Sequence, residues 1–275
     1  MKRFGRRYRL VVGNKKESLV IDQLRIAFDC TKTIKSDPNP ATVRVYNLSE
    51  TTRDRIISGE FKFVRFEAGY EELGLLFMGD IINPVIRKEG ADIITEIQVA
   101  DGFKAITESV SGVTVKSGST NKDIVNQVAK TMGDTQVSIA DVDTGSPLPR
   151  GKVLNGDSRF ILNQVAKNSN ADWSIQDGNL IVLPKGKVLP SGSGFVISQE
   201  TGMIGSPEKS DSGMELVYLL EPKIVIGSLI RVESIMKQYN GDYKVTDIKM
   251  IGDTHGDTWY SHITCIGGNF QNAKK

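Results

Sequence analysis

The chain has 275 residues, enough for one large domain or two to three modest ones. Charged residues make up 25% and hydrophobic residues 39%, as in ordinary soluble globular proteins. The net charge of +2 argues against a general affinity for nucleic acid or an anionic membrane. No signal peptide is visible, and no apolar run approaches the ~20 residues of a membrane span. We therefore expect a soluble protein made in the cytoplasm.

The first hundred residues are predicted to be mainly β. In the run 19–30, Leu24, Ile26 and Phe28 fall on one face at a period of two. Further strand-like runs separated by turn residues lie at 7–12, 41–48, 61–70, 75–85 and 93–101. One short helix is expected over 48–57, with Ser49 as N-cap. Several short strands with one helix predict a small barrel or sandwich.

The middle of the chain has a different character. An amphipathic helix is predicted over 121–130, with Thr120 or Asn121 as its cap, and a second over 160–167 repeats its Asn-Gln-Val-Ala-Lys segment. A hairpin is predicted over 170–183 around the turn Asp177-Gly178. Residues 185–194 are predicted to be a flexible connector.

The last part returns to β, and its polar end is expected to fray. Strands are predicted at 214–220, 229–233, 241–251 and 259–266, followed by the tail 269–275. The fold class is therefore α+β and mainly β. Its predicted domains are a first β-barrel (1–102), an α/β domain with two similar helices (103–195) and a second β-barrel (196–275).

Two histidines raise the question of a metal site. His255 and His262 could join Asp253 and Asp257 around an ion. The segment 252–257 is better explained as a hairpin tip, because Asp and Gly suit its backbone and no known ligand spacing is matched. No metal-binding, cofactor-binding or catalytic residue is assigned, and the protein is not expected to be an enzyme.

The other candidates for chemistry have simpler interpretations. The carboxylates are scattered: Glu71 and Glu72 lie in a turn, where both are expected to be solvated, while Asp101 and Glu108 lie near a domain junction. The segment 191–194 is read as linker rather than as a nucleophile elbow, and 112–118 lacks a phosphate-binding pattern.

Cysteines, tryptophans and the basic start are also assigned structural roles. Cys30 and Cys265 fit buried thiols in a reducing compartment, although a disulfide between them stays open. Trp173 and Trp259 are expected in cores rather than as base-stacking platforms. The basic start is interpreted as a solvated or interface-bound arm comprising Lys2, Arg3, Arg6, Arg7 and Arg9.

Three groups of residues resemble the central baseplate hub of contractile phage tails, as in Mu-like phages, and the base of type VI secretion spikes. The first group is 162–167 followed by Asp172-Trp173-Ser174-Ile175-Gln176-Asp177-Gly178. The second is Thr201-Gly202-Met203-Ile204-Gly205-Ser206-Pro207. The third is 241–245 with 252–254 and Trp259-Tyr260.

The resemblance implies a structural role in a virion tail baseplate, assembled in the host cytoplasm. It implies two tail-tube-like β-barrels per chain, so that a homotrimer forms a pseudo-hexameric ring joining the tail tube protein to the central spike protein. Other baseplate proteins would be partners, and the tape-measure protein and DNA would pass through the channel without specific binding. Lumen-facing residues are expected to be acidic or neutral. No cofactor and no membrane are implied.

Other functions remain open at this point. One is a tail-associated peptidoglycan hydrolase or carbohydrate-binding component. A tail-tube protein would need only one barrel per chain, and a nucleic-acid-binding module is disfavoured by the balanced charge.

Overall fold

The computed structural model describes residues 5–133, 135–141, 147–190 and 194–273. The protein is mainly β with few helices, and its largest feature is a sheet of thirteen strands. Among the described residues, no helix is both long and apolar enough to cross a membrane.

The elements follow the chain in three segments. The first contains β1 (Arg7–Gly13), β2 (Ser18–Ile21), β3 (Ile26–Thr33), β4 (Asn39–Tyr46), α1 (Glu50–Ile57), β5 (Phe63–Gly69), β6 (Leu73–Glu89) and β7 (Asp92–Asp101). The middle segment contains α2 (Phe103–Thr107), β8 (Val110–Val115), α3 (Asn121–Ala129), β9 (Gln136–Ala140), β10 (Lys152–Asp157), α4 (Ser158–Asn168), β11 (Ala171–Gln176), β12 (Asn179–Pro184) and β13 (Lys187–Val188). The last contains β14 (Phe195–Ile197), β15 (Met203–Ser210), β16 (Gly213–Leu219), β17 (Leu229–Val232), a 3-10 turn (Lys237–Tyr239), β18 (Gly241–Asp253), β19 (Trp259–Gly267) and β20 (Gln271–Asn272).

The helices begin where the side-chain chemistry of the sequence predicts. Ser49 caps α1 by accepting a hydrogen bond from the Thr52 amide at 3.3 Å. Thr120 and Asp123 form a capping box at the start of α3. The predicted second helix, α4, is also present, so all three expected helices are confirmed.

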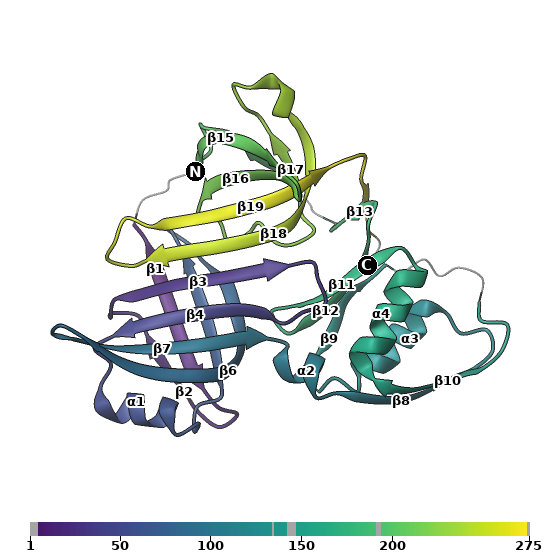
Figure 1. Ribbon diagram of the computed structural model, residues 1–275, viewed down its shortest axis with the longest axis horizontal. Helices are drawn as coiled ribbons and strands as arrows, with labels where there is room; N and C mark the ends of the chain where they lie inside the picture. Colours follow the sequence, from purple (N-terminus) through teal and green to yellow (C-terminus); the bar gives the residue numbers. More distant parts are fainter. Residues whose placement is uncertain (1–4, 134, 142–146, 191–193, 274–275) are drawn as a thin grey trace.

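The main sheet is mostly antiparallel and joins the first and last thirds of the chain. Its order is β15-β16-β19-β18-β3-β4-β7-β6-β5-β1-β2, with β17 and β14 branching from β18. Figure 1 shows β19, β18, β3, β4 and β7 side by side, with the helices of the middle segment at one end. The two thirds meet where β18 pairs with β3.

The strand order within this sheet occurs twice. The first unit has the order β3-β4-β7-β6-β5-β1, and the second unit has the order β15-β16-β19-β18-β17-β14. In each unit the last three strands in sequence form an antiparallel meander. These strands are β5-β6-β7 in the first unit and β17-β18-β19 in the second. The units differ at the outer strand, since β1 is antiparallel to β5 whereas β14 is parallel to β17.

Matching irregularities show that the two units correspond residue by residue. The β6–β7 ladder shifts between Ile81 and Asn83, and the β18–β19 ladder shifts between Val245 and Asp247. Just before each shift, one amide donates a hydrogen bond to the residue that precedes the strand on the other side, β5 or β17. Ile81 N donates to Lys62 O at 2.9 Å, and Val245 N donates to Ser228 O at 2.9 Å. A β-bulge is a specific structural device, so its recurrence fixes the alignment of β6 with β18.

The expectation of two closed barrels is wrong for the described residues. No pair of strands there closes either unit on itself, and both units belong to one sheet. One hydrophobic core also runs through both units, from Leu10 and Val43 in the first to Leu216 and Trp259 in the second. Alternation predicted which faces are buried, but it does not say which strand edges meet.

The middle segment has a hydrophobic core of its own. Helices α3 and α4 cover small sheets, and Ile124, Val128 and Leu162 share this core with Trp173. The predicted hairpin is present as β11 and β12, with Asp177 (φ 52°) and Gly178 (φ 76°) in the turn. The domain boundaries given above remain a prediction.

The predicted connector and frayed tail differ from the structure. Within 185–194, β13 pairs with β20 in a parallel ladder, and Ala273 is buried. The tail is therefore held against the start of the connector as far as Ala273. Residues 191–193, 274 and 275 lie outside the described residues.

Candidate assembly surface

The junction between the two units is an antiparallel ladder with a buried centre. Residues Asp247–Asp253 of β18 pair with Ala27–Thr33 of β3. Met250 lies opposite Cys30, and their exposed fractions are 3% and 2%. At one end of the ladder, Arg25 donates hydrogen bonds to the Asp253 carboxylate through two nitrogens, at 2.7 and 3.2 Å. Burial alone would raise the pKa of Asp253, but the contact with Arg25 helps to hold it below its usual value.

The corresponding strand of the first unit has no such cover. The half of β6 that corresponds to the junction, Asn83–Glu89, pairs with β7 alone among the described strands. Ile82 and Ile86 are each 42% exposed. Ile86 occupies the position of buried Met250, so the same place in the repeated unit is covered in one case and open in the other.

The other open edge belongs to the second unit. β15 is the last strand of the sheet, pairs with β16 only, and carries Ile204 at 42% exposure. It corresponds to β3, whose outer edge is covered by β18. Glu208 lies directly opposite Glu215 across the β15–β16 ladder, and both are exposed. Like charges at directly opposed positions destabilise a strand pair.

The two units touch a second time around a cavity of about 250 Å³. The β5–β6 turn (69–74) forms one wall, and the loop after β16 (220–223) forms the other. A Cβ on Gly74 would come within 2.5 Å of Pro222, so the turn and the loop are in close contact. Glu72, predicted to be solvated in this turn, accepts a hydrogen bond from Lys223 at 3.0 Å and raises the pKa of that amine.

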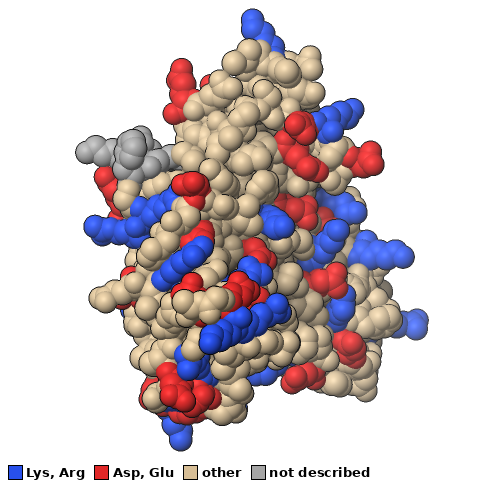
Figure 2. Space-filling model, turned by 60° about the vertical axis from the view of Figure 1, so that its left-hand side comes forward, with Lys and Arg blue, Asp and Glu red and all other residues tan. Residues whose placement is uncertain are grey.

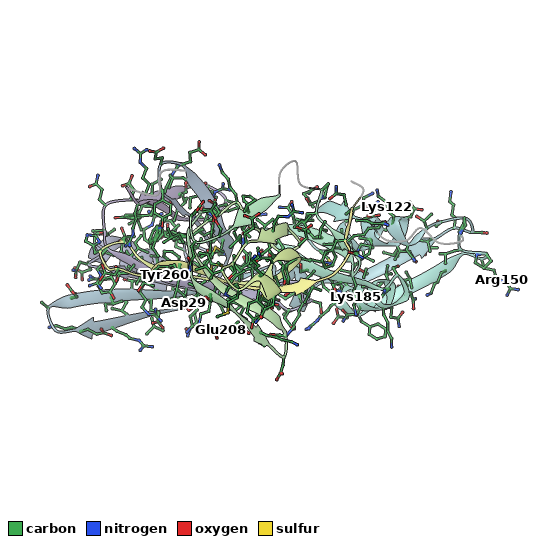
Figure 3. The ribbon with its side chains drawn as sticks, turned by 90° about the horizontal axis from the view of Figure 1, so that it is seen from above. Asp29, Lys122, Arg150, Lys185, Glu208 and Tyr260 are labelled. Atoms are coloured by element: carbon green, nitrogen blue, oxygen red, sulfur yellow. The ribbon has the colours of Figure 1, made fainter. Side chains whose placement is uncertain are left out.

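The sheet face away from the core carries charges that are mutually neutralised. Arg44 contacts Glu96 at 3.0 Å and Asp29 at 3.4 Å, and Arg87 contacts Glu96 at 3.4 Å. Figure 3 shows Asp29, Tyr260 and Glu208 on one side of the molecule, and Tyr260 and Asp29 both lie opposite Ile251 in adjacent ladders. We call this the polar face. On the side drawn in Figure 2, basic and acidic side chains are likewise interspersed.

A buried cluster of charges joins the middle segment to the sheet. Lys32 binds the Asp177 carboxylate at 2.5 Å, and its side chain is 5% exposed. Asp101 accepts hydrogen bonds from the amides of Asp177 and Gly178, the latter at 3.0 Å. Burial, with the nearby charge of Asp177, raises the pKa of Asp101 to about 7. This carboxyl joins the end of β7 to the turn between β11 and β12.

The residues considered for a metal site serve the hairpin between β18 and β19. Asp253 accepts hydrogen bonds from the amides of His255 (2.9 Å) and Gly256 (3.2 Å). His262 lies on β19 opposite Lys249, and burial together with that charge lowers its pKa. In the described ranges, no group of three or more potential ligands could hold a metal ion.

The two cysteines and the two tryptophans lie in cores. Cys30 and Cys265 are free and buried, and burial raises the pKa of each thiol to about 12. The prediction for both tryptophans is confirmed: Trp173 is 3% exposed and donates to Asn163 at 2.8 Å, and Trp259 is fully buried.

The basic start is partly fixed to the sheet rather than free. The Arg6 guanidinium lies 5.3 Å from the centre of the Trp259 ring and donates to carbonyls of the β18–β19 hairpin. Arg9 lies 3.9 Å from Glu67, a long and exposed contact. Lys2 and Arg3 lie outside the described residues.

Sequence reasoning missed the two open edges. The segment containing β15 was singled out only as a resemblance, and nothing distinguished β6 from the other strands. The apolar side chains of Ile82 and Ile86 in the run 81–89 mark the β6 edge, but their exposure is known only from the structure.

One protein-family model matches most of the chain. The model of the family described as "Baseplate hub gp41" matches residues 8–265. No curated protein matches the chain.

Solved structures show the same fold at low identity. The 43 kDa tail protein of prophage MuSo2 from Shewanella oneidensis has a TM-score of 0.67 at 11% identity, covering 95% of this chain and 97% of that chain. A tail protein from Neisseria meningitidis MC58 has a TM-score of 0.68 at 10% identity, covering 97% and 98%. An E. coli component of the type VI secretion system, described as similar to the T4 tail proteins gp27 and gp5, has a TM-score of 0.62 at 10% identity, covering 97% and 79%.

Proposed function

Since the chain belongs to the baseplate hub gp41 family, we propose that three copies of it form a ring of six similar units that joins a tail tube to a central spike. The family is a structural one whose place is the tail baseplate. The ring, its symmetry and its partners are the proposed part.

One observation carries the proposal, namely the repeated strand order. Each chain presents two units with the order β3-β4-β7-β6 and β15-β16-β19-β18, joined edge to edge by β18 and β3. The two edges are different surfaces, so the contact is heterologous and can be repeated in a ring. Three copies would then supply six units, which suits a sixfold tube on one side and a threefold spike on the other.

The same arrangement would give the ring a channel. Because the core lies on one side of the sheet, the polar face is the surface available to line a channel, while the middle segment would lie outside the ring. We expected acidic or neutral lumen residues. On this face the arginines Arg44 and Arg87 are balanced by carboxylates, which would let DNA and the tape-measure protein pass without trapping the phosphate backbone.

The test is the mass and shape of the purified chain. Light scattering or native mass spectrometry should give three copies, and negative-stain images should show a ring with a central hole. A cell-wall zymogram should stay blank. A monomer that hydrolyses peptidoglycan would overturn the proposal in favour of a tail-associated hydrolase.

A further inference from the structure

We propose that the open edge of β6 in one copy pairs with the open edge of β15 in a second copy, as β18 pairs with β3 within the chain. This inference rests on the proposed ring and names the residues that close it. Its geometry is taken from the repeat. β6 corresponds to β18, and β15 corresponds to β3. The edges of β18 and β3 cover each other within the chain, whereas the matching edges of β6 and β15 are open among the described strands.

The ladders fix the register of the new contact. The shared bulge places Asn83 at the position of Asp247, so Ile86 corresponds to Met250 and Arg87 to Ile251. The β4–β7 and β16–β19 ladders align Thr42 with Glu215. Asp29 lies opposite Thr42, and Glu208 lies opposite Glu215, so Glu208 is the counterpart of Asp29.

The transferred register brings opposite charges together. Ile251 lies opposite Asp29 within the chain, so Arg87 of one copy lies opposite Glu208 of the next. Arg87 is 57% exposed, and Glu208 already faces the like charge of Glu215. An incoming guanidinium would lie on the side of Glu208 away from Glu215, and its charge would offset the repulsion between the two carboxylates. A directly opposed pair of opposite charges stabilises a strand pair, and here it also relieves a repulsion.

A second contact transfers with the first. Within the chain, the β5–β6 turn of the first unit touches the loop after β16 of the second unit, at Gly74 and Pro222. Between copies, the corresponding elements are the loop 233–240 after β17 and the connection 47–62 after β4. Ile235 in that loop is 80% exposed and Met236 is 48% exposed. Ile57, in α1, is 42% exposed on the other side. The repeat thus supplies cover for Ile235 and Met236, two exposed apolar side chains of this loop.

Pro84 defines how much of the edge can bond. In β18 the corresponding residue, Ile248, lies opposite Lys32. Proline has no amide hydrogen to donate, so at this point β6 can only accept. Hydrogen bonding between copies is therefore expected mainly over 85–89.

Engineered cysteines at the opposed positions test the register. Residues directly opposite in an antiparallel pair lie within disulfide range, so the variant R87C/E208C should cross-link between copies on mild oxidation. Because a ring of three is closed, the ladder on a non-reducing gel should end at the covalent trimer. The native Cys30 and Cys265 are buried and do not compete.

A shifted pair serves as the matched control. Lys88 follows Arg87 and points to the opposite face of β6, so K88C/E208C should give at least tenfold less cross-linked product under the same conditions. Equal cross-linking by both variants would overturn the register.

Two further variants test the charges and the loop. R87E and E208R should each lower the trimer fraction about threefold to tenfold, and the double swap R87E/E208R should restore it, whereas R150E in the exposed middle segment should have no effect. I235D should weaken the trimer, while V110D, at a residue 71% exposed in the middle segment, should not.

The outcomes separate this inference from the proposed function. A wild-type trimer without any cross-link in R87C/E208C would overturn the β6–β15 junction and leave the ring. A wild-type chain that stays monomeric at its highest soluble concentration, again with no cross-link, would overturn both.

Discussion

β6 and β18 hold the same position in two copies of one unit, yet one edge is buried and the other is open. Met250 on β18, which pairs with β3, is 3% exposed, while its counterpart Ile86 on β6 is 42% exposed. An open edge with apolar side chains is a hazard that proteins usually blunt. In the proposed ring, the cover that β6 lacks among the described strands comes from a second copy.

The largest expected effect comes from placing a charge at each of the two matched positions. Met250→Lys would bury an unpaired ammonium and should lower the free energy of unfolding by at least about 3 kcal/mol in urea denaturation. Ile86→Lys should change the stability of the monomer by less than ~0.5 kcal/mol, because the new charge stays in water. The same Ile86→Lys change should lower the trimer fraction. Equal losses of monomer stability would contradict the alignment of the two strands.

A second difference between the units is the joint to the middle segment. It lies at Asp101 at the end of β7, and the aligned residue at the end of β19 is exposed Gly267. The pKa of Asp101 is raised to about 7, from 3.8, so folding favours its protonated form. Its contribution to stability is therefore complete below about pH 4 and is lost as the pH rises through 7.

The measurement is the pH dependence of unfolding with and without this carboxyl. Between pH 4 and 7.5, the free energy of unfolding of the wild type should fall by about 2 kcal/mol relative to that of Asp101→Asn. This figure allows for the amide hydrogen bonds and the charge of Lys32, which favour the ionised carboxylate. Asp101→Asn keeps an acceptor for the Gly178 amide but cannot titrate. The stability of each protein is compared with its own value at pH 4. Parallel pH profiles for the two proteins would show that Asp101 does not titrate in this range.

A third matched pair tests how closely the junction is packed. A Cβ on Gly252 would come within 2.5 Å of the Phe28 ring, and its β6 counterpart is exposed Lys88. Gly252→Ala should therefore cost about 2 kcal/mol through overpacking, measured as a lower denaturation midpoint. Lys88→Ala should leave the midpoint unchanged. A tolerated alanine at 252 would mean that β3 and β18 can separate.

Local chemistry made part of this fold predictable. The caps at Ser49 and Thr120 and the turn Asp177-Gly178 depend on neighbours within a few residues, and all three are present where expected. The pairing of β18 with β3 was not predictable, because it joins Met250 to Cys30 across most of the chain. Alternation reveals which side of a strand is buried but carries no information about which edge it meets.

The assembly surface was hidden for the same reason. The relation between Arg87 and Glu208 appears only after two sets of ladders have been aligned, and no spacing in the sequence reports it. The residues considered for a metal site illustrate the opposite case. Asp253 and His255 are close in sequence, and their proximity is explained by the hairpin that needs them.

The smallest expected effect concerns the ends of the two matched edges. Asp253 ends β18 and binds Arg25 as well as two hairpin amides, whereas its counterpart Glu89 is exposed at the end of β6. Asp253→Ala should cost about 1 kcal/mol, because the Arg25 side chain is 43% exposed and most of the loss comes from the two amides. Glu89→Ala should cost less than ~0.5 kcal/mol in the monomer. Thermal unfolding of the two variants side by side is the measurement. Were Glu89→Ala the more damaging of the two, β6 would already have a partner within the chain, and the need for a second copy would disappear.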